Sequence, residues 1–544
     1  MTSSLIRGRP RRARAHISAR VVHALLGALI GVVWLVLPGT AAGGAVAGGP
    51  HRPMAGALGH RDDRGTHTAD LVLPMIAVVA AGALASFGFW RRRRRTSGRT
   101  TPGGAPVTGG EPPDEELDAR AREALVRADG WVRVSREELG FAEARFENVE
   151  NDERFEDGPP EEIEDARRAL REAETELAAA FRIRRRYEHG VPEEDAARRH
   201  ALAGIVGRCE EAGRLLDVQA AAFDTLRGLE EGPRGGLGAA LTVAEARFRG
   251  LTARTAEADA TLRDLGDRYA APASSTVVGN VEQAKDRLVF ATTRLNLARQ
   301  AADAGEFGRA ASRLRAAEGA IAQAGVLIDG VERLRRDLAT AAELVPAALT
   351  GAEAEIAGAR RALAGETAAH PDVTPGELRA RTGHADVVLA GVRQEVASGR
   401  PYDPLGLLRR IVRAVAPLAA GRAGVLPAAA AVCARAAVAR ADDVVATHGA
   451  VVGCAARTRL AEARRLEHAE DPADLVTADT LAEEAHALAD QDTRLHGHPP
   501  EPTPDLTAAS LGALHPTPHS YGGPRTSTRR REPDDPGWTG ARHG

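Results

Sequence analysis

Apolar residues recur at intervals of three and four along most of the chain beyond residue 114. One run comprises Leu202, Ile205, Cys209, Ala212, Leu216, Phe223 and Leu226, and others begin at Ile163, Leu241, Val281 and Ala310. Such steps average about 3.5 residues, the period of coiled-coil helices, whereas strands repeat every second residue. The pattern therefore predicts a coiled-coil helical region over residues 114–400.

Proline and glycine separate these runs. The breaks fall at residues 158–160 (GPP), 190–192 (GVP), 232–238, 271–273 (APA) and 303–305 (DAG). Both residue types stop helices, and helices joined by short turns fold back on one another. The chain is therefore expected to be all-α, with a long antiparallel coiled-coil helical bundle. Its helices of about 25 to 40 residues would reach roughly 40 to 60 Å at helical rise.

Residues 401–495 are predicted to form a second, less regular helical region. Tyr402, Asp403 and Pro404 mark a helix start, because aspartate caps a helix and proline fits its first turn. Pro417 and Pro427 interrupt the pattern that follows. Residues 496–544 are rich in Pro, His, Gly and Thr, a composition that predicts a disordered tail.

An uncharged apolar stretch stands before the helical region. Residues 71–90 read LVLPMIAVVAAGALASFGFW, and Arg91, Arg92, Arg93, Arg94 and Arg95 follow directly. About twenty apolar residues in a helix match the hydrocarbon thickness of a bilayer. An arginine run beside a span marks its cytoplasmic side and attracts anionic lipid head groups. We therefore predict one transmembrane helix at 71–90, a basic juxtamembrane linker at 91–113, and a large cytoplasmic part held at the cell membrane.

The first 47 residues resemble a secretory signal peptide. Six arginines precede the apolar residues 21–37, and Ala45 and Ala47 form an A-x-A site. This order is typical of a signal peptide, and an uncleaved first transmembrane helix is the alternative. Residues 48–70 then form a short extracytoplasmic segment, which has too few large apolar residues to bury a core.

Composition narrows the possible chemistry. The net charge is −3, so we expect no nucleic-acid partner, and the aromatic content of 3% is typical of long helices. Lys285 is the single lysine and no Gly-Lys-Ser/Thr surrounds it, which excludes a phosphate-binding P-loop. Cys209, Cys433 and Cys454 lie far apart and indicate neither a zinc site nor a disulfide framework. We assign no catalytic residue, cofactor or metal.

Two further motifs have weaker alternative interpretations. His496 and His498 could contact a metal, but two histidines in a predicted disordered tail give a poor coordination geometry. Residues 303–311 resemble the turn and second helix of a tetratricopeptide unit. A tetratricopeptide array needs at least three such units, and one is found, so a bundle is favoured over a helical-repeat peptide receptor.

Residues 278–292, VGNVEQAKDRLVFAT, resemble the cytoplasmic coiled-coil region of actinobacterial TPM-domain membrane proteins. So do residues 137–142, 402–404 and 456–463, and the resemblance covers roughly residues 71 to 493. The order of signal peptide, outer part, span, arginine run and long helices is also similar. In that family an outer TPM domain, linked in some relatives to metal binding or phosphatase activity, precedes the span. That domain is missing here, so no residue inherits those roles.

The sequence therefore predicts a membrane-anchored cytoplasmic coiled-coil scaffold. Its expected partners are membrane lipids, through the arginine run, and itself or other envelope proteins, through helical surfaces. A degenerate TPM-type phosphatase and a helical-repeat peptide receptor are the alternatives.

Overall fold

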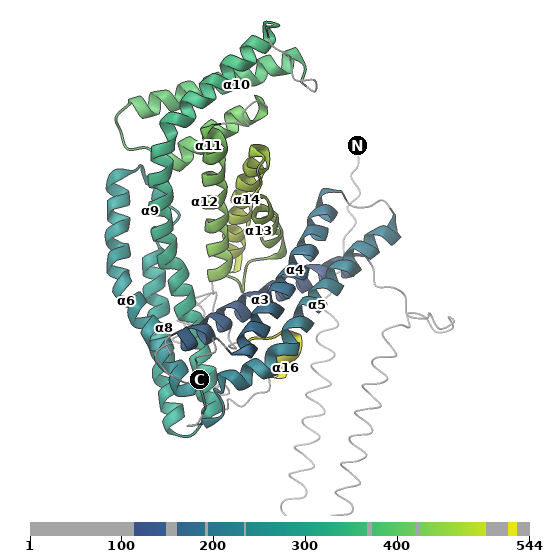
Figure 1. Cartoon of the computed structure of the whole chain (residues 1–544), viewed down its shortest axis with the longest axis vertical. Coiled ribbons are helices and arrows are strands. Elements are labelled where there is room, and N and C mark those ends of the chain that lie inside the picture. Colours follow the sequence, from purple (N-terminus) through teal and green to yellow (C-terminus); the bar gives the residue numbers. More distant parts are fainter. Residues whose placement is uncertain are drawn as a thin grey trace, which may run out of the picture. The chain divides into compact units, whose positions relative to one another are not determined.

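The computed structural model describes residues 114–147, 160–190, 194–232, 235–366, 373–418, 424–496 and 520–529. All of them belong to one compact unit, Gly110–Gly544. Within these ranges every regular element is a helix and no strand occurs (Figure 1). The all-α prediction is therefore confirmed for the part of the chain that the structure describes.

Three helices form the N-terminal part of this unit: α3 (Asp114–Glu147), α4 (Glu161–His189) and α5 (Asp195–Arg227). The residues that the repeat places on one face of α4 are buried, among them Ile163, Ala166 and Leu170. They share a core with Leu202, Ile205 and Cys209 of α5. The three-four spacing thus produces helices that pack through a continuous apolar stripe.

The next helices are α6 (Leu237–Arg268), the short α7 (Ala271–Ser274), α8 (Asn280–Asp303) and α9 (Phe307–Leu363). Helices α8 and α9 are joined by a tight turn in which Gly305 adopts a φ of +76°, a conformation that favours glycine. Helix α9 contains 57 residues and is longer than the predicted helices. It continues through Pro346 because Val345, Ala348, Ala352 and Ile356 extend its buried face into another core.

The C-terminal helices are α10 (Pro375–Ala397), α11 (Pro404–Val415), the 3₁₀ turn η3 (Ala416–Leu418), α12 (Val425–Thr447), α13 (Cys454–Leu466) and α14 (Pro472–His496). The predicted cap is confirmed, since the Gly406 amide donates to Asp403 Oδ1 at 3.0 Å. Pro417 lies in η3, where α11 ends. Pro427 lies in the first turn of α12 and does not interrupt it, because the first amides of a helix have no partner within the helix.

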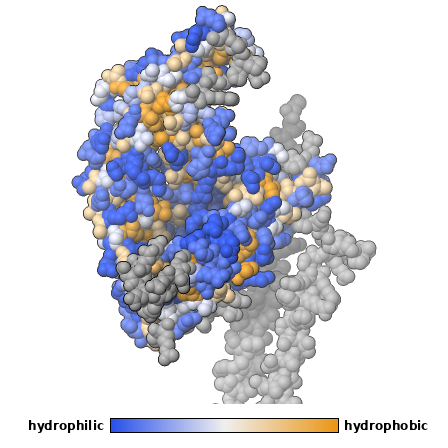
Figure 2. Space-filling view, in the orientation of Figure 1, coloured by the Kyte–Doolittle hydropathy of each residue, from blue (hydrophilic) through white to orange (hydrophobic). Residues whose placement is uncertain are grey.

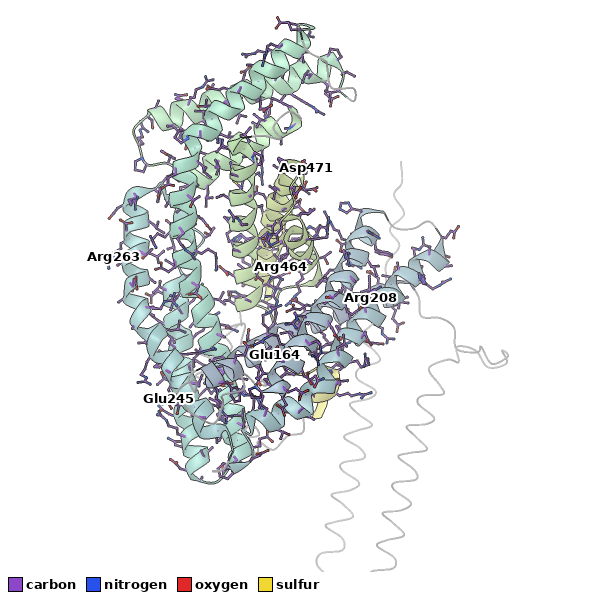
Figure 3. The ribbon with its side chains drawn as sticks, in the orientation of Figure 1. Glu164, Arg208, Glu245, Arg263, Arg464 and Asp471 are labelled. Carbon is purple, nitrogen blue, oxygen red and sulfur yellow. The ribbon has the colours of Figure 1, made fainter. Side chains whose placement is uncertain are left out.

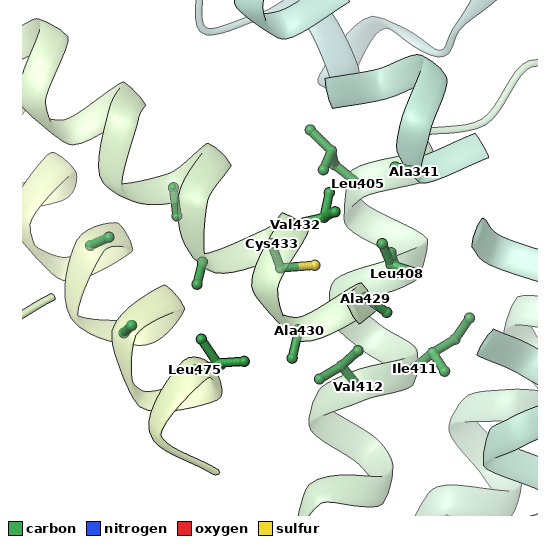
Figure 4. Close-up of a cluster of buried hydrophobic side chains, with 14 of the residues drawn as sticks. Ala341, Leu405, Leu408, Ile411, Val412, Ala429, Ala430, Val432, Cys433 and Leu475 are labelled. Atoms are coloured by element: carbon green, nitrogen blue, oxygen red, sulfur yellow. The ribbon is translucent and has the colours of Figure 1, made fainter. Parts of the chain in front are cut away.

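The described apolar side chains gather in four clusters, and not in the single bundle that the repeats predict. The largest cluster combines the second half of α9 with α10–α14 and thus takes residues from both sides of position 400. Figure 4 shows part of it, including Leu408 and Ile411 of α11 and Ala429 and Cys433 of α12. Helix α9 belongs to three of the four clusters and so joins the groups of helices.

Part of the predicted disordered tail is folded. Residues 520–529 include the short helix α16 (Pro524–Arg529), which packs against α5 (Figure 1). Tyr521 is 0% exposed and belongs to the same core as α3, α4 and α5. The prediction is wrong here because composition alone does not reveal one aromatic ring that has a place in a core. Residues 497–519 and 530–544 lie outside the described residues.

No described helix combines the length and the hydrophobicity that a membrane crossing requires. The predicted signal peptide or first span (1–47), extracytoplasmic segment (48–70), transmembrane helix (71–90) and linker (91–113) lie outside the described residues. They therefore stay predictions.

Candidate functional site

The residues singled out for membrane contact, Arg91, Arg92, Arg93, Arg94 and Arg95, also lie outside the described residues. Within those ranges no group of three or more His, Cys, Asp or Glu side chains is arranged to hold a metal. The three cysteines are buried free thiols, and burial raises the pKa of Cys209 and of Cys433 to about 12. Such thiols stay protonated at neutral pH and are poor nucleophiles.

Residues 278–292, which resemble the TPM-domain proteins, include side chains of α8 that form ion pairs and hydrogen bonds with neighbouring helices. Lys285 Nζ forms ion pairs with Asp259 at 2.8 Å and with Glu282 at 2.9 Å. Arg287 is 2% exposed and donates to Gln323 Oε1 at 2.9 Å and to the Thr447 carbonyl at 3.3 Å. Burial lowers the pKa of Arg287 to about 10, so it remains a cation at neutral pH. These residues hold α8 against α6, α9 and the end of α12.

Two buried arginines and two buried glutamates join α3, α5 and α9. Arg227 contacts Glu318 at 2.7 Å and Glu138 at 3.0 Å, and Arg315 contacts Glu138 at 2.9 Å. Burial by itself lowers the pKa of Arg227. The carboxylates of Glu318 and Glu138 raise it by more than burial lowers it, so the net shift is upward. We call this set the Glu138 cluster.

A second set joins α3 to α12 and α13. Asp129 forms ion pairs with Arg133, at 3.0 Å, and with Arg457, while Arg133 also contacts Asp442 at 2.9 Å. Arg464, labelled in Figure 3, forms an ion pair with Asp442. Burial raises the pKa of Asp129, but the surrounding arginines lower it more, and the net shift is well below the usual range.

Both sets join helices through buried ion pairs. Each carboxylate is held by guanidinium groups, which do not release protons at physiological pH and so cannot serve as general acids or bases. Breaking a buried pair leaves an uncompensated charge, so these pairs favour one relative placement of the helices.

A shallow pocket of about 300 Å³ lies between α3, α6 and α9, lined by Phe141, Arg247, Leu251, Arg254 and Ile321. Arg247 stacks over the Phe141 ring at 4.3 Å and donates to the Gly140 carbonyl, while Arg254 forms an ion pair with Asp329 at 2.6 Å. Its charged groups thus have partners. On the face shown in Figure 2, hydrophilic residues predominate and apolar ones are scattered among them.

The candidate site is the surface on which residues 520–526 dock. We call it the docking surface and define it by Trp131 and Ser135 of α3, Ala166 of α4, and Gly213, Asp217 and Phe223 of α5. The Tyr521 ring stacks on Phe223 with ring centroids 4.6 Å apart, and its hydroxyl donates to the Ala166 carbonyl at 2.7 Å. Burial raises the pKa of the Tyr521 hydroxyl, which therefore stays a neutral donor.

Main-chain amides of the segment meet polar side chains of the helices. The Gly522 amide donates to Ser135 Oγ at 3.1 Å. The carboxylate of Asp217 accepts from the amides of Gly523, Arg525 and Thr526 at 2.9 to 3.1 Å, and from Thr526 Oγ1 at 2.8 Å. Four donors converge on this one carboxylate, and they include amides at the start of α16, where a helix offers its N–H groups no acceptor of its own.

Two glycines allow the backbones to approach closely. A Cβ atom at Gly213 would stand 2.6 Å from Pro524 Cδ and 3.0 Å from Trp131 Cζ3. A Cβ atom at Gly523 would stand 2.1 Å from the Gly213 carbonyl oxygen. Only hydrogen atoms fit at these two positions, so the docking surface and the segment are complementary in shape as well as in hydrogen bonding.

The sequence prediction missed this site entirely. One signal was available: Tyr521 is one of four tyrosines in the chain, and Gly-Gly-Pro follows it within a predicted disordered tail. The hydrogen-bond partners of the segment are Ser135, Ala166 and Asp217. They lie more than 300 positions away in sequence, and no periodic pattern relates them to the tail.

Comparison with known proteins finds similarity to two proteins of Mycobacterium tuberculosis, UPF0603 protein MT2410 and UPF0603 protein Rv2345. Each is 29% identical to this chain over 402 residues, which is 70% of this chain and 58% of the relative. The chain thus spans less than two thirds of the length of these relatives. No family model and no solved structure matches it.

Proposed function

We propose that this protein is a membrane-anchored scaffold whose cytoplasmic helices bind short peptide segments of interacting proteins. The observation that carries the proposal is the docked segment 520–526, which the helices hold through a buried aromatic ring, backbone amides and a close glycine contact. Ring stacking, hydrogen bonds to backbone amides and close glycine packing are contacts by which an interaction protein recognises a peptide.

The buried ion pairs support the same role. The Glu138 cluster joins α3, α5 and α9, and the pairs around Asp129 join α3, α12 and α13. Paired charges inside a protein favour a single helix arrangement, and a scaffold needs its binding surfaces in constant positions.

Membrane anchoring is the second part of the proposal and rests on residues 71–90 with Arg91, Arg92, Arg93, Arg94 and Arg95. It predicts that the full-length chain sediments with membranes and that protease added to intact spheroplasts leaves residues 114–496 uncut. Replacing the five arginines with glutamine should weaken or scramble this orientation. A full-length chain that stays soluble after high-speed centrifugation contradicts the anchor.

The scaffold itself is tested by proximity labelling from the C-terminus in the native host. The expected result is a reproducible set of membrane-associated neighbours that is depleted when Asp217 is replaced with alanine. A neighbour set that Asp217→Ala leaves unchanged argues against peptide binding at this surface.

Of the two alternatives, a peptide receptor is favoured by the docked segment, although one tetratricopeptide-like unit does not make a helical-repeat array. A degenerate TPM-type phosphatase has no supporting observation among the described residues, where no metal-binding group occurs.

A further inference from the structure

The hydrogen bonds that hold the tail come from five residues of the segment: Tyr521, Gly522, Gly523, Arg525 and Thr526. Their partners on the docking surface belong to α3, α4 and α5, helices that share one buried core, to which Cys454 of α13 and Tyr521 itself also contribute. Those partners thus lie within residues 114–227, far from the tail in sequence. The surface therefore recognises a short peptide, whichever chain supplies it.

The contacts define the class of ligand. An aromatic residue with a hydroxyl is needed to stack on Phe223 and reach the Ala166 carbonyl. The second residue after it must be glycine, because a Cβ at Gly523 meets the Gly213 carbonyl oxygen. Gly522 has a φ of +138°, a conformation that side chains rarely adopt. A threonine five residues after the aromatic residue supplies the hydroxyl that donates to Asp217. The ligand is thus a Tyr-Gly-Gly-Pro-x-Thr segment.

The docked segment is joined to α14 by residues 497–519, which are 23 residues. A chain of this length spans at most roughly 80 Å. A second chain can therefore supply the same segment with identical contacts, and exchange of an identical element is a low-cost route to association.

We infer that the docking surface is a peptide-binding site that takes residues 520–526 from a second copy of this chain. The inference rests on the proposed function and deepens it by naming one ligand. A tail on the same chain competes, since a tether of this kind supplies an effective concentration on the order of millimolar. The second copy is favoured when the chain's own surface is blocked or when anchored chains are crowded.

The test uses two full-length variants in detergent or nanodiscs. Gly213→Ala blocks the docking surface but leaves the tail intact, and Tyr521→Ala disables the tail but leaves the surface intact. Neither variant can dock its own tail. Mixed together, they complement each other, because the tail of the first fits the surface of the second.

The matched control is Gly207→Ala, since a Cβ at Gly207 meets no atom within 4 Å and lies on the same helix. Both substitutions raise the helix propensity of α5, so neither should prevent folding. Melting temperatures of all variants check this before binding is compared.

The association of differently tagged copies is then measured by pull-down and by cross-linking of the tail to α5. We expect the Gly213→Ala and Tyr521→Ala mixture to give at least tenfold more tail-to-α5 cross-linking than either variant alone. A mixture with Gly207→Ala in place of Gly213→Ala should give less, because that tail docks in its own chain. Cross-linking in the complementing mixture no greater than in the single variants overturns the inference.

A second measurement does not depend on association of whole chains. A labelled synthetic peptide of residues 520–529 is titrated into full-length Tyr521→Ala, whose surface is vacant. Adding Gly213→Ala to this chain should weaken peptide binding at least tenfold, and adding Gly207→Ala should leave it within twofold. Equal binding to both overturns the inference, whereas membrane sedimentation and proximity labelling test the scaffold proposal independently.

Discussion

Gly213 of α5 and Pro524 of the C-terminal segment lie so close that a Cβ atom on the glycine would stand 2.6 Å from the proline Cδ. Glycine within a helix costs about 1 kcal/mol relative to alanine. At position 213 the helix bears this cost, and the missing side chain lets Pro524, 311 positions away in sequence, come into contact with α5. The relationship makes docking of the tail separable from folding of α5.

Replacing Gly213 with alanine should therefore release the tail without unfolding the helices. Hydrogen exchange measured by mass spectrometry on the full chain should show faster exchange in residues 520–529, where Gly522, Gly523 and Thr526 now donate to Ser135 and Asp217. Peptides from α3 and α4 should keep their protection. In Gly207→Ala, residues 520–529 should exchange as slowly as in the natural chain, and fast exchange there would contradict the steric argument.

Tyr521→Phe should weaken tail docking by about 0.5 to 1.5 kcal/mol, because it removes one hydrogen bond to a backbone carbonyl and keeps the ring. Tyr521→Ala should abolish docking, since the stacked ring is lost as well. The loss of global stability cannot exceed the docking free energy, because the tail then simply stays undocked. Exchange rates of residues 520–529 in the two variants measure both effects, and equal rates would contradict the role assigned to the hydroxyl or the ring.

Arg227→Met should lower the free energy of unfolding by about 3 to 5 kcal/mol. The substitution leaves Glu138 and Glu318 buried with Arg315 as their remaining cation in the Glu138 cluster. Arg309→Met is the control, because its partner Glu306 and the arginine itself are both about half exposed. Such a surface pair is worth at most about 1 kcal/mol. Urea unfolding followed by circular dichroism gives both values, and similar losses in the two variants would contradict a structural role for the cluster.

Stability should fall as the pH drops below about 6.5, and His448 should account for part of the fall. Burial lowers the pKa of His448, and the nearby charge of Arg287 lowers it further. Between that lowered pKa and about 6.5 the unfolded chain binds more protons than the folded one, so the free energy of unfolding decreases with falling pH. Each unit of pKa shift is worth about 1.4 kcal/mol.

The measurement compares the free energy of unfolding at pH 7.5 and 5.5 in the natural chain and in His448→Asn. The natural chain should lose more stability over this interval, because asparagine does not titrate while it retains a polar group near Thr447, whose hydroxyl lies 2.9 Å from His448 Nδ1. Identical losses in the two chains would show that His448 is not responsible.

Much of the helical fold followed from local patterns. The apolar positions spaced by three and four in α4 are buried, as are those in α5 apart from the partly buried Leu226. Asp403 caps α11, as its place before Pro404 predicts. The length of α9 was not predictable in this way. Pro346 is a local signal to stop a helix, and it was outweighed by packing of Val345, Ala348 and Ala352 in a core shared with α11 and α12.

The sequence by itself determined the all-α class, the helix starts and the apolar faces, because these depend on residues three or four positions apart. Only the tertiary structure decided that Asp217 accepts four hydrogen bonds from the tail, that Glu138 meets Arg227 and Arg315, and that Tyr521 has a place in a core. These contacts join residues some 90 to 355 positions apart, and such pairs form only when several helices are in place at once. The local spacing of apolar residues does not predict these contacts, since it does not distinguish a charged or aromatic residue that contacts water from one that contacts a distant helix.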